Sequence, residues 1–138
     1  MADASRTAIV EELFRAWSSG DADAPRDLLT ADAVLDDVIG GLHVGWPAIR
    51  AYFARGLEHW PDLTLVPTGD YWERPDGLAL TWVMSATAPD DRFGPGTAGR
   101  RWQAPGMSFV VFDGDRVARE VDYHDGGSRG RSLQQEAP

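Results

Sequence analysis

The stretch from Ala33 to Phe53, AVLDDVIGGLHVGWPAIRAYF, places two adjacent aspartates in an apolar run that precedes a helical pattern. Alternating hydrophobicity predicts a strand over residues 33–39, which ends at Gly40 and Gly41. Pro47 is typical of a first helical turn, because its missing N–H group needs no partner there. This stretch therefore predicts a strand, a loop and a helix, around which the remaining elements can be arranged.

Asp37 is the first candidate for chemistry. Successive side chains of a strand alternate between its faces, so Asp37 shares a face with Leu35 and Ile39, whereas Asp36 lies on the other face. A carboxylate among aliphatic neighbours either finds partners or has its pKa raised by desolvation, which would make it a usable base. Two interpretations stay open: a general base, and a carboxylate that caps the following loop through backbone N–H groups.

The composition is that of one ordinary globular domain. The 138 residues are 43% hydrophobic and 25% charged, with a formal net charge of -9, so nucleic acid and anionic membranes would be repelled. Cysteine is absent, and the histidines and aspartates show no spacing typical of a metal site. The first residues show no signal-peptide pattern, and no apolar run reaches 18 residues. We expect a cytoplasmic protein without a metal or other cofactor.

Periodicity divides the chain into helices followed by strands. Apolar spacing predicts helices over residues 7–18, 21–30 and from Pro47 to about Leu57. After Trp60 the patterns are typical of β-strands, at residues 63–72, 78–88, 101–112 and 117–125. Helices followed by four or five strands predict an α+β fold in which a curved antiparallel sheet wraps around the N-terminal helices.

The same patterns predict one domain over residues 1–125 and a flexible polar tail over residues 126–138. Residues 89–99, rich in glycine, proline and aspartate, predict a loop that could lie over a pocket mouth. One face of the sheet can cover the helices, and we expect the other to be buried in a homodimer. Its apolar residues would be Met107, Phe109, Val111, Val121 and Tyr123.

The order of the motifs resembles the nuclear transport factor 2-like superfamily, and within it the SnoaL-like polyketide cyclases and the ketosteroid isomerases. The resemblance covers roughly residues 8–125 and rests on short segments: SGD at 19–21, ADAV at 31–34, GWPAIRAYF at 45–53, PGMSFVVFDGDRV at 105–117 and DYHD at 122–125. Their order and spacing are specific for the fold and much less so for a reaction. The resemblance implies a cone of curved sheet closed by helices around a deep pocket, often in a dimer.

The resemblance also implies roles for particular residues. Asp37 matches the general-base aspartate of the ketosteroid isomerases, but Leu13 and Ser108 stand where those enzymes carry the tyrosine and protonated aspartate of an oxyanion hole. Both departures count against steroid isomerisation. Asp122 could match the last-strand acid of limonene-epoxide-hydrolase-like members or of SnoaL-like cyclases, with Asp125 as a second choice for the cyclases. The arginine and aspartate of the former, and the preceding-strand histidine of the latter, are missing.

The predicted site combines these acids with a histidine and an apolar lining. Glu120, Asp122 and His124 share one face of the last strand, which the resemblance directs into the pocket. The candidate catalytic residues are Asp37, Asp122 and His124. The candidate substrate-binding residues are Trp17, Phe53, Trp60, Trp82 and Val110.

Three functions remain open, and an enzyme is favoured. Because no phosphate-binding loop or nucleophile motif is present, the chemistry left for an enzyme is cofactor-free acid–base chemistry. The first is a cyclase or isomerase that removes a proton next to a carbonyl of a hydrophobic small molecule, a polyketide or related secondary metabolite. The second is an epoxide hydrolase or epoxide-opening cyclase that uses paired acids. The third is a non-catalytic dimer that binds a hydrophobic ligand, and the missing oxyanion groups keep it open.

Overall fold

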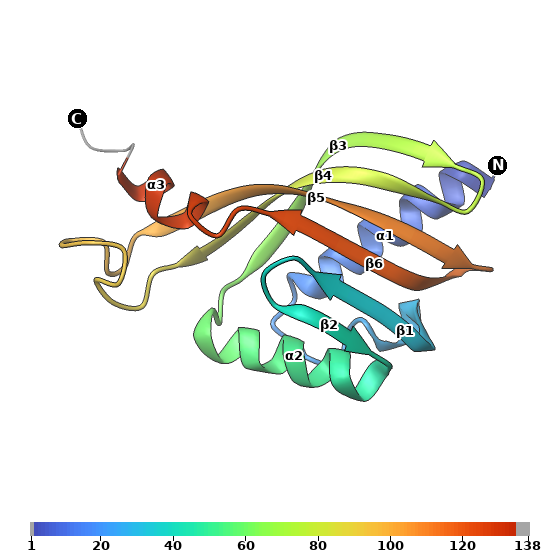
Figure 1. Ribbon diagram of the computed structural model, residues 1–138, viewed down its shortest axis with the longest axis horizontal. Coiled ribbons are helices and arrows are strands. Elements are labelled where there is room, and N and C mark those ends of the chain that lie inside the picture. The colour runs from blue at the N-terminus through green and yellow to red at the C-terminus, as the bar shows by residue number, and fades with distance from the viewer. Residues whose placement is uncertain (1, 135–138) are drawn as a thin grey trace.

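The structure, a computed structural model, describes residues 2–134 and contains three α-helices and one six-stranded sheet (Figure 1). The helices are α1 (Ala2–Trp17), α2 (Trp46–His59) and α3 (Ser128–Gln134), and a 3-10 turn, η1 (Arg26–Leu28), precedes the sheet. The strands are β1 (Leu29–Asp37), β2 (Gly41–Val44), β3 (Thr64–Arg74), β4 (Gly77–Thr87), β5 (Arg101–Asp113) and β6 (Arg116–His124). None of the helices within residues 2–134 is both long and apolar enough to cross a membrane.

The sheet is curved and open, with the strand order β2-β1-β6-β5-β4-β3 (Figure 1). Neighbouring strands are antiparallel, except that β1 and β6 run parallel. The predicted α+β class, a curved sheet around the N-terminal helices, is confirmed. The strand that the sequence pattern does not predict is β2, where Gly41, with φ of 89°, lets the chain turn back and pair with β1.

The predicted helix over residues 21–30 is wrong except for the three residues of η1. Leu29 already belongs to β1, where it lies opposite Val117 of β6. Its side chain is only 4% exposed. Burial and strand pairing of Leu29 therefore outweigh the weak local preference for a helix.

The core lies between the helices and the inward face of the sheet. The α1 residues that face the core, Val10, Leu13 and Phe14, are completely buried. Ile49 and Phe53 of α2 are 1% and 6% exposed. They belong to the same cluster as residues of β4 and β5, including Leu78, Leu80, Trp82, Trp102, Ala104 and Val110. Because burying one large apolar side chain contributes about 1.5–3 kcal/mol, this cluster is the main source of stability.

The predicted flexible tail over residues 126–138 is wrong for its central part, which forms α3. Leu133 of this helix is 1% exposed. The Arg100 side chain donates a hydrogen bond to the Leu133 carbonyl oxygen at 2.8 Å, and the Gln103 N–H donates to the Ser132 Oγ at 3.0 Å. One buried leucine and contacts with the start of β5 hold this helix, which is why composition does not reveal it. Residues 135–138 lie outside the described part of the chain.

The outward face of the sheet carries exposed apolar side chains, as the sequence predicts. Phe109 and Tyr123 are 37% and 47% exposed, and their rings stack with centroids 6.1 Å apart. Val121, expected on this surface, is only 4% exposed because it lies between Phe109 and Asp36 in the sheet. Other exposed apolar residues are Val38, Leu42, Val44, Val66, Trp72 and Met107.

Gly106 of β5 permits a close approach of a ring to the sheet. A Cβ atom at this position would lie 2.3 Å from the Cη2 atom of Trp82. The absence of a side chain lets the Trp82 indole lie against β5, where its Nε1 donates a hydrogen bond to the Ser108 Oγ at 2.8 Å. Gly106 therefore positions an indole that also lines the pocket described below.

We predict that Gly106→Ala lowers the free energy of unfolding by about 1–3 kcal/mol, because the added methyl group overpacks against a buried ring. Gly56→Ala is the matched control, since a Cβ there has nothing within 4 Å. In the helix interior that change should raise the unfolding free energy by about 0.5–1 kcal/mol. Urea unfolding of both variants is the measurement, and a Gly106→Ala protein as stable as wild type would contradict the tight packing.

Candidate active site

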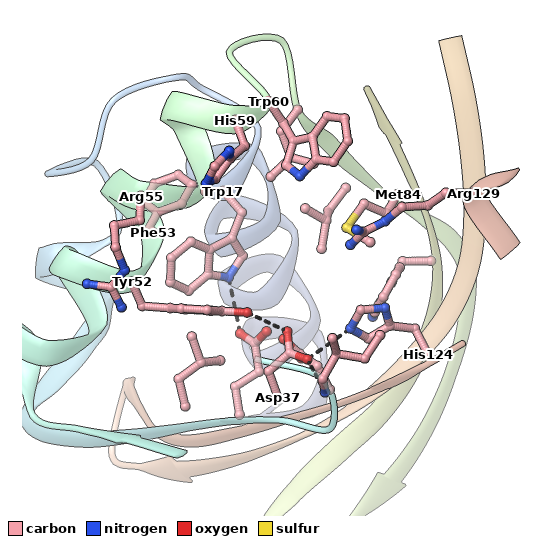
Figure 2. Close-up of a pocket in the computed structure, with 18 residues that line it drawn as sticks. Trp17, Asp37, Tyr52, Phe53, Arg55, His59, Trp60, Met84, His124 and Arg129 are labelled. Carbon is pink, nitrogen blue, oxygen red and sulfur yellow. Dashed lines mark hydrogen bonds and ion pairs between the residues drawn. The ribbon is translucent and has the colours of Figure 1, made fainter. Parts of the chain in front are cut away.

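A pocket of about 340 Å³ lies between α2 and the inward face of the sheet (Figure 2). Residues from every helix and from four strands line it: Trp17, Leu35, Asp37, Ile39, Tyr52, Phe53, Arg55, Gly56, His59, Trp60, Leu63, Leu65, Trp82, Met84, Glu120, Asp122, His124 and Arg129. Most of the lining is apolar or aromatic, and the acidic groups come from β1 and β6. A concave apolar site with a few convergent polar groups is typical of small-molecule binding.

The pocket contains seven of the eight residues that the sequence analysis selects. All three candidate catalytic residues, Asp37, Asp122 and His124, line it, as do four of the apolar candidates, Trp17, Phe53, Trp60 and Trp82. Val110 does not. It is 1% exposed and belongs to the packed core cluster.

Asp37, at the end of β1, accepts hydrogen bonds on both carboxylate oxygens. Its Oδ1 accepts from the backbone N–H groups of Ile39 and Gly40 at 2.8 and 3.1 Å, and from Nε2 of His124 at 2.9 Å. Its Oδ2 accepts from the Tyr52 hydroxyl at 3.0 Å. Figure 2 shows this carboxylate between Tyr52 and His124. Asp37 therefore joins β1, the following turn, α2 and β6.

These donors decide the charge of Asp37. Burial by itself would raise its pKa, but the bonds from His124 and from the two backbone N–H groups outweigh burial and lower the pKa to about 2. The carboxylate accepts the backbone N–H bonds of the following loop that the capping interpretation expects, and it also has side-chain partners. An ionised group with this pKa is a weak proton acceptor at neutral pH.

Asp37 positions His124 through one ring nitrogen, and the other ring nitrogen has no hydrogen-bond partner within residues 2–134. Because the carboxylate can only accept, Nε2 carries the hydrogen, and in the neutral imidazole Nδ1 then keeps a lone pair. Nδ1 is buried and has no hydrogen-bond partner within residues 2–134. The side chain packs 5.8 Å from the Trp82 ring, measured between centroids. His124 is thus an oriented imidazole in the pocket wall with an unused nitrogen.

Glu120 and Asp122 form a buried carboxyl pair on β6. Glu120 accepts a hydrogen bond from Nε1 of Trp17 at 3.1 Å, and Asp122 accepts from the Ser108 hydroxyl at 2.6 Å. The two carboxyl groups are also hydrogen-bonded to each other. Burial, followed by the charge of Asp122, raises the pKa of Glu120 well above its ordinary value, and burial also raises that of Asp122. The upward direction at Glu120 favours a protonated carboxyl group at that position.

Five lining residues with polar side chains are not among the sequence candidates: Tyr52, Arg55, His59, Glu120 and Arg129. Glu120 lies two residues before Asp122 on the predicted inward face of the last strand, so the alternation of side chains along that strand could have identified it. Tyr52 comes from α2, and burial followed by the charge of Asp37 raises the pKa of its hydroxyl. Arg129 belongs to α3, inside the segment predicted to be a flexible tail. Neither Tyr52 nor Arg129 has a local sequence pattern that distinguishes it from a surface residue.

Asp36, Asp125 and His43 are polar residues close to these segments that do not line the pocket. Asp36 lies on the opposite face of β1 from Asp37, 3.8 Å from Arg119 of β6. Asp125 is exposed and pairs with Arg131. His43 stacks on the Tyr52 ring with centroids 4.0 Å apart. Within residues 2–134 no group of three or more His, Asp or Glu residues is arranged to hold a metal ion.

A family model described as a SnoaL-like domain matches residues 10–120 of the chain. Among solved structures, a candidate polyketide cyclase from Acidithiobacillus ferrooxidans superposes with a TM-score of 0.80 at 22% identity, over 96% of each chain. IdmH, a candidate polyketide cyclase from Streptomyces antibioticus, gives 0.79 at 18% identity, over 94% of this chain and 98% of its own. A protein from Catenulispora acidiphila with a ketosteroid isomerase-like fold, solved with trimethylamine, gives 0.78 at 18% identity, over 94% and 97%. At these identities the likeness shows the fold alone, and no curated protein matches the sequence significantly.

We predict that Asp37→Asn lowers the free energy of unfolding at pH 7 by about 1–2 kcal/mol, because the charge that holds His124 and Tyr52 is lost. The pKa of Asp37 is lowered from 3.8 to about 2 on folding, so its stabilising effect is present above about pH 4 and disappears as the pH falls towards 2. Wild type and variant should therefore converge over that range in urea unfolding. Asp36→Asn, the exposed control, should change stability by less than about 0.5 kcal/mol. A variant as stable as wild type at pH 7 would contradict the role given to Asp37.

Unlike Asp37→Asn, Glu120→Gln should not lower the free energy of unfolding at pH 7. A glutamine amide can still donate to Asp122 and accept from Trp17, so we expect unfolding free energy at pH 7 to stay unchanged or to rise by up to about 1 kcal/mol. The pKa of Glu120 is raised on folding, so its favourable contribution is complete at low pH and is lost as the pH rises through the raised value. Thermal melts at pH 5 and pH 8 should show that the melting temperature of the variant, relative to that of wild type, is higher at pH 8 than at pH 5. Identical pH dependence in both proteins would mean that Glu120 is not the protonated partner.

Proposed function

The chain belongs to the SnoaL-like domain family, and we propose that it is a cofactor-free acid–base enzyme that acts on a hydrophobic small molecule. The family and its neighbours with the same fold include candidate small-molecule cyclases. A polyketide or a related secondary metabolite is the proposed substrate, and the proposed reaction is cyclisation or isomerisation that begins with proton abstraction next to a carbonyl. The observation that carries the proposal is the buried carboxyl pair of Glu120 and Asp122, which lines an otherwise apolar pocket beside the oriented His124 ring.

In the proposed step, Asp122 takes a proton from the carbon next to the substrate carbonyl, and the C–H electron pair moves to the carbonyl oxygen to form an enolate. The raised pKa of Asp122 supports this role, because it makes the carboxylate a stronger base than one in water. The enolate carbon then attacks a second carbonyl carbon and closes a ring, or is protonated at another carbon of the conjugated system. Glu120, or a His124 ring that has first taken up a proton at Nδ1, supplies the proton that completes either reaction.

Asp37 has a supporting place in this scheme. Its pKa of about 2 disfavours proton abstraction by the aspartate itself, whereas its bond to Nε2 holds the His124 ring and directs Nδ1 to another partner. A carboxylate that orients an imidazole is a recurring arrangement in enzymes that transfer protons. We therefore propose Asp122 and His124 as the groups that contact the substrate and Asp37 as the residue that positions His124.

Epoxide opening is the alternative reaction, and the same carboxyl pair supports it. A protonated acid can donate to the epoxide oxygen as its C–O bond breaks, while an ionised neighbour takes a proton from the attacking water or hydroxyl. Burial raises the pKa of both Glu120 and Asp122, which favours a proton on the pair and supports such a division of roles. An apolar pocket with an oriented imidazole suits an enolate and an epoxide equally. Proton abstraction remains the first proposal because the neighbours with the same fold include candidate polyketide cyclases.

Deuterium exchange tests the proposal before the natural substrate is known. The protein would be incubated in D2O with a panel of aromatic 1,3-diketones, and incorporation at the carbon between the carbonyls followed by NMR. We expect acceleration by wild type, a rate at least about 10²-fold lower for Asp122→Asn, which removes the proposed base, and an unchanged rate for Asp36→Asn. His124→Gln should also lower the rate, because glutamine cannot carry the proton.

Other outcomes of this experiment separate the three functions. Incorporation of 18O from labelled water into a panel of aryl epoxides, without deuterium exchange into diketones, would favour epoxide opening. Ligand-induced quenching of tryptophan fluorescence with neither reaction would favour a non-catalytic binding protein. Exchange that persists in Asp122→Asn would remove Asp122 from the mechanism.

We also propose that the protein is a homodimer joined through the outward face of the sheet, because stacked Phe109 and Tyr123 form an exposed apolar surface there. Replacing both residues by arginine should yield monomers with an unchanged circular dichroism spectrum. The control is Ala51→Arg on the exposed side of α2, which should not alter the mass. Sedimentation of the wild type as a monomer at micromolar concentration would refute the dimer.

A further inference from the structure

Arg129 is a half-buried cation that the proposed reaction does not use. It belongs to α3, and its guanidinium carbon lies 4.8 Å from the Trp102 ring centroid and 5.4 Å from that of Trp60. Figure 2 shows Arg129 reaching into the pocket from α3, near Met84. Because α3 is attached through buried Leu133, the two indoles and the helix hold the guanidinium at a defined place.

This guanidinium lacks an anionic partner. Arg50, Arg92 and Arg101 each pair with an aspartate at 2.6 to 2.9 Å. Arg129 has no ion pair or side-chain hydrogen bond with any residue in 2–134, and its buried Nε is left unsatisfied. Burial lowers the pKa of Arg129, and the charge of Asp37, which is not in contact with it, offsets this desolvation only in part. A buried donor without an acceptor is costly, and a ligand that supplies the acceptor removes the cost.

We propose that Arg129 determines substrate specificity by binding an ionised carboxylate of the ligand. A planar guanidinium with parallel N–H groups matches a carboxylate in shape and charge. This inference rests on the proposed function in that it concerns the same pocket, and it narrows the substrate class to hydrophobic aromatic acids. The carboxylate would bind at the α3 end of the pocket, and the reacting carbonyl would lie towards β6.

The charges around the pocket support this orientation. Asp37 and the Glu120–Asp122 pair lie on β1 and β6, where a ligand carboxylate would be repelled. Arg129 and the exposed Arg55 of α2 are the arginines in the lining. An acidic ligand is therefore attracted to one side of the pocket and repelled by the other, although the whole chain carries a formal charge of -9.

The test compares acids with their neutral esters. Affinities of 2-naphthoate and anthraquinone-2-carboxylate, and of the methyl ester of each, would be measured by calorimetry at pH 7. We expect wild type to bind at least one acid about ten-fold or more tightly than its ester. Arg129→Gln should abolish this preference and leave the ester affinity within about two-fold. Arg129→Lys should restore only part of it, because lysine keeps the charge without the planar fork.

Arg131→Gln is the matched control, since Arg131 lies on the same helix but points to solvent and pairs with Asp125. It should leave both affinities unchanged. Equal affinity of wild type for acids and esters, or no binding of either, overturns the proposal. The proposal is also overturned if the preference for the acid persists in Arg129→Gln, or if it is lost in Arg55→Gln alone. A loss of binding of both the acid and the ester in Arg129→Gln overturns it as well.

The result separates this inference from the proposed reaction. A carboxylate preference that depends on Arg129, without deuterium exchange or epoxide opening, would refute the catalytic proposal and leave the ligand class standing. Exchange into diketones without any acid preference would refute the role of Arg129 alone.

Discussion

The parallel pairing of β1 with β6 is the constraint on which the site depends. It joins segments far apart in the chain and places Leu35 opposite Glu120 and Asp37 opposite Asp122. The Val38 N–H continues the ladder by donating to the Asp122 carbonyl oxygen at 3.0 Å. Because side chains alternate along a strand, a slip of one residue would turn one set of acids towards the outward face. This register therefore gathers three carboxyl groups and His124 on one wall.

Collecting acids in an apolar pocket is costly unless their charges are reduced or compensated. The structure uses a different solution for each group. Asp37 keeps its charge because two backbone N–H groups, Tyr52 and His124 all donate to it. Burial raises the pKa of Glu120, which favours a neutral carboxyl group beside Asp122. Unequal environments of this kind separate acids from bases within one site, and such separation is what proton-transfer chemistry requires.

The core and the site are continuous through hydrogen bonds from buried indoles. Trp82 lies against Gly106, donates to Ser108, and Ser108 in turn donates to Asp122. Trp17, at the end of α1, donates to Glu120. The packing that stabilises the fold thus also orients the carboxyl groups. The fold is shared with many proteins, so the reaction must come from such local arrangements rather than from the fold itself.

The sequence by itself determined the fold class, the main helices and strands, and which side chains share a strand face, because these follow from periodicity and alternation along single segments. The inward direction of Asp122 and His124 was implied by the resemblance to a known fold. It also separated Asp37 from Asp36, which indeed lie on opposite faces of β1. Only the tertiary structure decided that Asp37 is a well-bonded anion rather than a base with a raised pKa, because its donors Tyr52 and His124 come from other elements. The same reason applies to Arg129 and α3: a polar segment with one buried leucine has no periodic pattern, and its place is set by contacts with β5 and Trp60 that lie far away in the chain.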